Sequence, residues 1–149
     1  MKMLLQGDNL TKDQAKRTSP VTLAFVGDAV YALYVRERLV KVGAGKVGDY
    51  QRSSAKILSA RGQSEFLAEI ENLFTDEERE IYLRGRNAKK ATKSKNASPA
   101  EYNRSTGLEA VVGFLYLTGE IARVEELLSA ISDEKFKTIC QATAFKPSH

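Results

Sequence analysis

Two carboxylates stand inside stretches of sequence that are otherwise apolar. Asp28 is the single charged residue of "LAFVGDAVYALYV", and Glu109 is the single charged residue of "LEAVVGFLYL". At helical spacing, Asp28 shares a face with Ala24 and Tyr31, so we expect its side chain to point inward and away from solvent. A buried carboxylate without a partner costs several kcal/mol. Each of the two should therefore have a partner.

Three kinds of partner are possible. Each carboxylate could accept hydrogen bonds from tyrosines or pair with an arginine such as Arg36 or Arg104. The two could instead share one proton, or both could bind a hard divalent cation. Mg²⁺ takes oxygen ligands and keeps several waters, which suits a chain with one cysteine and one histidine. Such an ion lowers the pKa of a bound water and so supplies hydroxide for hydrolysis at neutral pH.

Small residues accompany both carboxylates and would let their helices approach closely; they are Gly27, Ala29, Gly107, Ala110 and Gly113. Ordinary helix packing is the alternative use of such residues. Close approach of the two helices would bring Asp28 and Glu109 together.

A basic segment, "RGRNAKKATKSK", contains neither an acidic nor an aromatic residue. Repelling cations between small polar residues suit contact with phosphates, and the lack of aromatic rings disfavours stacking on single strands. We therefore expect contact with the backbone of a duplex, which for RNA means contact with the A-form shape and its 2′-hydroxyls, while a solvated surface loop is the alternative. The candidate RNA-binding residues are Arg84, Arg86, Asn87, Lys89, Lys90, Lys93 and Lys95.

Helical periodicity dominates the chain, and the fold class we predict is an all-α bundle. Ser19 and Pro20 begin a long helix that Gly43 ends, and a second helical pattern covers residues 47–73 with a bend near Gly62. Capping boxes begin two more helices, at Thr75 and at Ser98. Two shorter helices follow, and we see no strand signal.

Composition narrows the function. The chain has 149 residues and a net charge of +4, which fits one domain and permits a polyanionic partner. Cys140 and His149 are the only cysteine and histidine, so no disulfide, thiolate–imidazole zinc site or histidine acid–base pair is available. The start lacks the apolar region of a signal peptide, and no apolar run approaches a membrane span. We expect a cytoplasmic protein.

The two apolar motifs resemble those of the ribonuclease III family. "LAFVGDAVYALYV" resembles its signature helix and "STGLEAVVGFLYL" its second catalytic helix, in the same order and at a similar separation. "YQRSSAKILSARGQ" and "RGRNAKK" are similar to the short bacterial branch, mini-ribonuclease III. The resemblance implies one catalytic domain over residues 1–149, with the endonuclease-domain helical bundle and no double-stranded-RNA-binding domain.

The resemblance also implies an activity. The family's members are Mg²⁺-dependent endoribonucleases, with Mn²⁺ as a possible substitute, that cut double-stranded RNA as homodimers. Products would carry 5′-phosphate and 3′-hydroxyl ends, and the branch is associated with maturation of ribosomal RNA precursors. Asp28 and Glu109 match metal ligands of the family. Ala24 and Thr106 stand where the family has a glutamate and an aspartate, so water or Thr106 would complete a looser metal shell.

Two other functions remain open at this point. The same scaffold could be a noncatalytic RNA-binding or ribosome-assembly protein whose reduced carboxylate set no longer works. A purely structural helical protein would bind no nucleic acid at all. Metal-dependent formation of RNA fragments separates the first reading from these two.

Overall fold

The computed structural model describes residues 7–42, 47–90 and 97–142, and within these ranges it contains helices and no strand. The predicted all-α fold class is confirmed. The helices are α1 (Lys12–Lys16), α2 (Pro20–Val42), α3 (Val47–Leu58), α4 (Ala60–Ile70), the 3₁₀ helix η1 (Glu71–Leu73), α5 (Asp76–Asn87), α6 (Pro99–Leu117), α7 (Ile121–Leu128) and α8 (Asp133–Ala142).

Local capping sets where the main helices begin. The Ser19 hydroxyl accepts a hydrogen bond from the Val21 amide at 3.2 Å, directly before Pro20 opens α2. Both predicted capping boxes are present, at Thr75 for α5 and at Ser98 for α6. The helices that carry Asp28 and Glu109 therefore start where the sequence predicts.

Residues 47–73 form α3, α4 and η1 where the sequence predicted one helix bent near Gly62. The break falls at Ser59, whose hydroxyl accepts a hydrogen bond from the Gly62 amide at 3.0 Å and donates one to the Lys56 carbonyl at 2.6 Å. A Cβ atom on Gly62 would overlap that carbonyl, so only glycine permits this tight turn. The turn sets α4 against α6.

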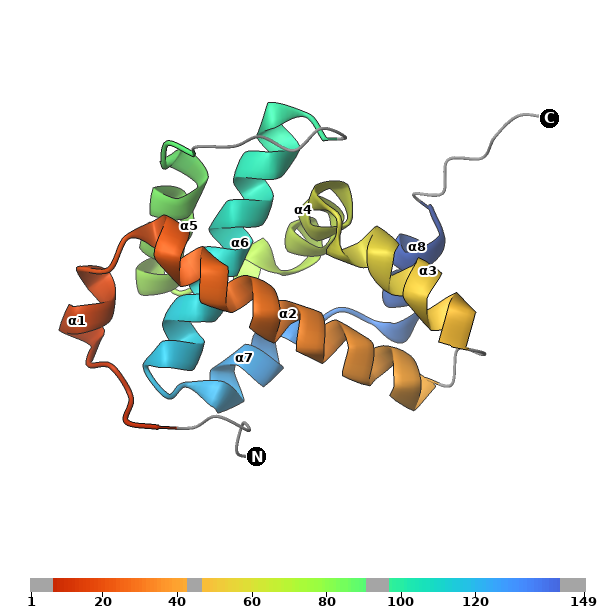
Figure 1. The fold of residues 1–149 in the computed structure, drawn as a ribbon, viewed down its shortest axis with the longest axis horizontal. Helices are drawn as coiled ribbons and strands as arrows, with labels where there is room; N and C mark the ends of the chain where they lie inside the picture. The colour runs from red at the N-terminus through yellow and green to blue at the C-terminus, as the bar shows by residue number, and fades with distance from the viewer. Residues whose placement is uncertain (1–6, 43–46, 91–96, 143–149) are drawn as a thin grey trace.

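Helix α6 is the centre of the fold, with α2, α5 and α4 packed around it (Figure 1). At the crossing of α2 and α6, a Cβ on Gly27 would overlap the Glu109 carbonyl, and one on Gly113 would overlap the Leu23 carbonyl. A Cβ on Gly107 would come within 2.7 Å of the Tyr82 ring of α5. The small residues thus bring the backbones together, as predicted.

Helix α2 also keeps an apolar face away from the rest of the chain. Its exposed large apolar side chains are Val21, Phe25, Leu33 and Val40, and Phe25 is 80% exposed. Ala29 lies on the same exposed side, so the prediction that it packs between helices is wrong. No helix in the described ranges has both the length and the apolar character of a membrane span.

Candidate active site

The carboxyl groups of Asp28 and Glu109 meet where α2 crosses α6. They are joined by a hydrogen bond, although the residues lie on different helices. A hydrogen bond between two carboxyl groups requires that one of them carries a proton. The close backbone contact at Gly27, the residue before Asp28, explains how the two side chains come within reach.

Glu109 is the member of the pair that holds the proton at neutral pH. Burial, and then the hydrogen bond with Asp28, raise the pKa of Glu109 to about 8, while the amide of Gln63 acts in the opposite direction. In the chain by itself, this raised pKa fits the second of the three arrangements considered from the sequence, in which the two carboxyl groups share one proton.

The expectation that Asp28 points away from solvent is wrong. Asp28 is exposed, whereas Ala24 and Tyr31, predicted on the same face, are 5% and 0% exposed. The buried side of α2 is centred near Gly27, so at 100° per residue Asp28 lies at the edge of that side. The pair consequently has one half-buried carboxyl, Glu109, and one that faces solvent.

Arginine does not neutralise either carboxylate in the part of the chain that the structure describes. The ion pairs found there involve other acidic residues. Arg104 donates instead to the Ser64 hydroxyl at 2.7 Å, and the Tyr31 hydroxyl donates to the Ile57 carbonyl at 3.1 Å. These predicted structural partners of the carboxylates are thus engaged elsewhere.

Gln63 is a member of the site that the sequence did not reveal. Its side chain is 3% exposed, and its Nε2 donates to Glu109 Oε2 at 3.1 Å and to the Leu58 carbonyl at 3.0 Å. A glutamine in an amphipathic helix gives no sign that it is buried. Its contact with Glu109 joins residues that are 46 positions apart.

The donor atoms of the pair suit a divalent cation. Within the described ranges no three or more Asp, Glu, His or Cys side chains form a metal-binding group, and Thr106 is buried with its hydroxyl donating to the Tyr102 carbonyl. Mg²⁺ characteristically uses one or two carboxylates together with waters and substrate phosphates. Two carboxyl groups that must share a proton gain most from such a charge.

Residues of the predicted basic segment lie at the end of α5. Lys89 is exposed and Arg84 is half-buried. The Arg86 guanidinium lies 5.9 Å from the centroid of the Tyr82 ring, and its Nε donates to Asn87 Oδ1 at 3.1 Å. Lys93 and Lys95, also predicted to bind RNA, lie outside the described residues.

Lys90 differs from its neighbours because its ammonium group caps carbonyls at the end of α5. It donates to the carbonyls of Gly85 at 2.9 Å and Arg86 at 3.0 Å, and burial lowers the pKa of Lys90. A hollow of about 390 Å³ separates this end of α5 from the start of α6, and it is lined by Ala88, Lys89, Lys90, Ala97, Pro99, Tyr102 and Asn103. Tyr102 precedes Glu109 by two helical turns, roughly 10 Å along α6.

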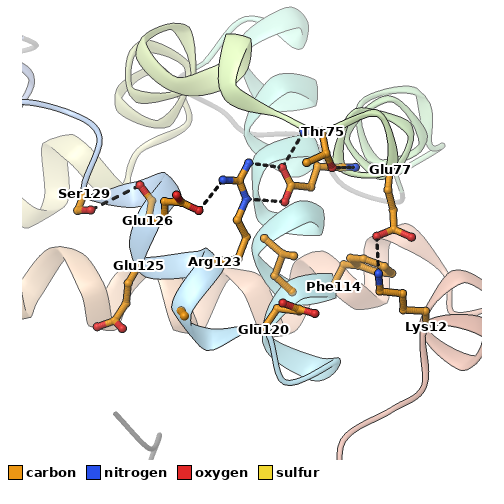
Figure 2. A pocket seen from close by; sticks show the side chains of 12 residues that line it. Lys12, Thr75, Glu77, Phe114, Glu120, Arg123, Glu125, Glu126 and Ser129 are labelled. Carbon is orange, nitrogen blue, oxygen red and sulfur yellow. Dashed lines mark hydrogen bonds and ion pairs between the residues drawn. The ribbon is translucent and has the colours of Figure 1, made fainter.

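A larger hollow, of about 710 Å³, contains neither carboxylate of the pair. In it the Arg123 guanidinium is held by both oxygens of Glu78, at 2.8 and 2.9 Å, and by Glu126 (Figure 2). It also donates to the Leu73 carbonyl at 2.8 Å. Lys12 at its rim pairs with Glu77. Both cations are thus already paired with carboxylates, which makes this hollow a poor phosphate site.

Comparison with known proteins gives a consistent result. Residues 21–120 match the Ribonuclease III domain family. A Mini-ribonuclease 3 of Staphylococcus aureus is 44% identical over 127 residues, covering 83% of this chain and 94% of the relative. The Mini-ribonuclease 3 of Clostridium tetani is 35% identical over 132 residues, covering 88% of this chain and 87% of the relative. A crystal structure of a Fusobacterium nucleatum protein, 26% identical, has a TM-score of 0.67 and covers 76% of this chain and 90% of its own.

Proposed function

Because the chain belongs to the ribonuclease III family, in its mini-ribonuclease III branch, we propose that it is a Mg²⁺-dependent endonuclease of double-stranded RNA. The observation that carries this proposal is the hydrogen-bonded pair of Asp28 and Glu109. The pair joins two helices at an edge open to solvent, where a phosphodiester can approach.

Asp28 and Glu109 would hold the cation, with Mn²⁺ as a possible substitute. When bound, the ion supplies the positive charge that activates water and offsets charge on the phosphate and its leaving oxygen. Glu109 gives up its shared proton and is oriented from behind by Gln63. Asp28 faces the solvent side, from which RNA arrives. Attack by water with departure of the 3′-oxygen leaves 5′-phosphate and 3′-hydroxyl ends.

Duplex RNA is the substrate class that the basic end of α5 favours. Arg84, Arg86 and Asn87 lie in the last turn of α5. Lys89 follows them and lines a hollow together with Pro99 and Tyr102 at the start of α6, the helix that carries Glu109. Contacts of this kind read the phosphate backbone and the shape of the duplex. Ribosomal RNA precursors, processed in the cytoplasm, are the natural substrate we propose from the relationship to the branch.

A second copy of the chain is the partner we propose for the apolar face of α2. Exposure of Phe25 and its apolar neighbours along one helix is unfavourable in water, and a twofold partner would cover them. Asp28 lies between this face and the buried side of α2. A homodimer would therefore bring the active sites of both subunits into one assembly.

A noncatalytic RNA-binding or ribosome-assembly protein is the second candidate. One observation favours it: the two carboxylates have no third acidic or imidazole ligand within the described residues. Such a protein would bind duplex RNA through the same basic residues and leave it intact.

Incubation with long double-stranded RNA, in Mg²⁺ or in excess chelator, distinguishes the two candidates. We expect fragments on a denaturing gel only with Mg²⁺, and degradation of those fragments by an exonuclease that requires a 5′-phosphate. RNA that stays intact with Mg²⁺ but is retarded on a native gel would favour the noncatalytic protein. RNA that is neither cut nor retarded would contradict both.

A further inference from the structure

Gln63 occupies a position that an apolar residue would ordinarily take. It lies in the first turns of α4, is 3% exposed, and faces the helix crossing where Glu109 lies. Its amide joins three elements, because it donates to the last residue of α3, Leu58, and to Glu109 of α6. The side chain therefore holds Glu109 from the interior of the protein.

The orientation of this amide follows from its partners. A backbone carbonyl can only accept, so the Leu58 oxygen requires the NH₂ group on its side. The second hydrogen of the same NH₂ group is then directed to Glu109 Oε2, 3.1 Å away. Flipping the amide would place its oxygen against the Leu58 carbonyl and break both bonds.

This orientation leaves Gln63 Oε1 buried without a hydrogen-bond partner in the described part of the chain. An unpaired buried acceptor destabilises the folded state, and a methionine of similar shape would have no such atom. Apolar packing therefore does not account for glutamine at this position. Its two donations do, one to the Leu58 carbonyl and one to Glu109, and only the second reaches the carboxylate pair.

We propose that Gln63 is a positioning residue for the active site, whose amide fixes the Glu109 carboxyl beside Asp28 so that the pair can bind a divalent cation. This inference rests on the proposed function, since it assigns Gln63 a role in the same site. RNA cannot touch a side chain that is 3% exposed, so the effect of Gln63 must pass through Glu109.

The substitution Gln63→Met tests this role, because methionine keeps the length of the side chain and removes the donor. Two readouts are needed: Mn²⁺ binding by the RNA-free protein, followed by electron paramagnetic resonance, and steady-state cleavage of duplex RNA in Mg²⁺. We expect Mn²⁺ affinity and kcat to fall roughly 10- to 100-fold while KM for RNA stays unchanged.

Ser64→Ala is the matched control. Ser64 is the next residue of α4, is also buried, and makes the neighbouring hydrogen bond from α4 to α6, with Arg104 at 2.7 Å. We expect this variant to bind Mn²⁺ and cleave RNA as the wild type does. Equal losses in S64A and Q63M would overturn the proposal, since they would reveal a general effect of α4 packing.

The outcomes separate this inference from the proposed function. If the wild type binds Mn²⁺ but cuts no duplex RNA, the proposed function fails and the Mn²⁺ affinities still decide the role of Gln63. Wild-type affinity and kcat in Q63M would overturn the positioning role alone, and a wild type that binds no Mn²⁺ would overturn it as well.

Should Q63M not fold, Gln63→Glu keeps the shape of the side chain and replaces the donor by an acceptor. A lowered kcat of this variant would support the proposal, and a wild-type kcat would overturn it.

Discussion

Gly27 of α2 lies directly against the backbone carbonyl of Glu109 in α6. No side chain separates the two helices at this point, and the neighbouring residue, Asp28, forms a hydrogen bond with the Glu109 carboxyl. The missing side chain at position 27 thus sets the distance between the two carboxyl groups. The packing of the fold and the geometry of the site depend on the same contact.

Gly27→Ala should therefore damage stability and activity together. The added methyl overlaps a backbone atom that cannot rotate away, so we expect the free energy of unfolding to fall by roughly 1–3 kcal/mol. RNA cleavage should fall as well, because Asp28 shifts with α2. Gly7→Ala is the control, since nothing lies within 4 Å of a Cβ there. A G27A variant with wild-type melting temperature and cleavage rate would refute this view of the crossing.

The shared proton predicts a dependence of stability on pH. The pKa of Glu109 is raised from 4.5 to about 8 in the folded chain, so between these values the folded state binds a proton that the unfolded state has lost. Stability of the metal-free wild type should fall with rising pH, by up to about 1.4 kcal/mol per pH unit from this group.

Denaturant titrations of wild type and Glu109→Gln, in chelator at pH 5 and pH 8, measure this effect. The free energy of unfolding of E109Q, relative to that of the wild type, should increase as the pH rises. Because a cation must displace the proton, Mg²⁺ should also stabilise the wild type more at pH 8 than at pH 6. A stability difference between the two proteins that does not change with pH would contradict the raised pKa.

Lys89 and Lys90 are neighbours in sequence but should behave differently when changed to methionine. Lys90 caps the carbonyls at the end of α5, so K90M should destabilise the fold by about 0.5–1 kcal/mol. Exposed Lys89 is available to phosphate, so K89M should leave stability unchanged and lower the salt dependence of duplex binding by about one charge. Binding titrations without Mg²⁺ at several salt concentrations, with melting curves, check both. Identical behaviour of the two variants would contradict the assignment.

Phe25→Asp tests the proposed dimer. Each of two subunits would lose the burial of one phenyl ring, about 2 kcal/mol per ring, which weakens association roughly 1000-fold. Sedimentation should find a dimer for the wild type and for the apolar control Phe25→Leu, and a monomer for F25D. A wild type that sediments as a monomer at micromolar concentration, or an F25D variant that remains dimeric, would exclude this interface.

Helix ends were predictable because their determinants are local. Ser98 and Glu101 begin α6 through contacts three residues apart, and the same pattern at Thr75 begins α5. The short helix α1, absent from the prediction, has a comparable signal in the capping box of Thr11 and Gln14. The division of residues 47–73 also has a local cause, since Ser59 is placed to cap a new helix. The prediction put the bend at Gly62, three residues after the actual break.

The geometry of the site depends on contacts between helices, which periodicity does not specify. Asp28 and Glu109 could be identified from the sequence because they interrupt apolar stretches. The helical spacing, however, predicted that Asp28 is buried, whereas in the structure it lies at the exposed edge of the buried face of α2. No sequence signal marks Gln63, whose partners are a backbone carbonyl and a carboxylate on another helix. Interactions of this kind become visible only once α4 is docked on α6.

Cleavage of duplex RNA by Asp28→Asn and Glu109→Gln, under single-turnover conditions with Mg²⁺, tests the central claim most directly. Both substitutions keep the size of the side chain, and Glu120→Gln, exposed and outside the carboxylate pair, is the control. We predict folded variants whose cleavage rates fall roughly 1000-fold, because the cation contributes several kcal/mol to the reaction, while E120Q retains the wild-type rate. Cleavage at the wild-type rate by either D28N or E109Q would contradict the assignment of this pair as the active site.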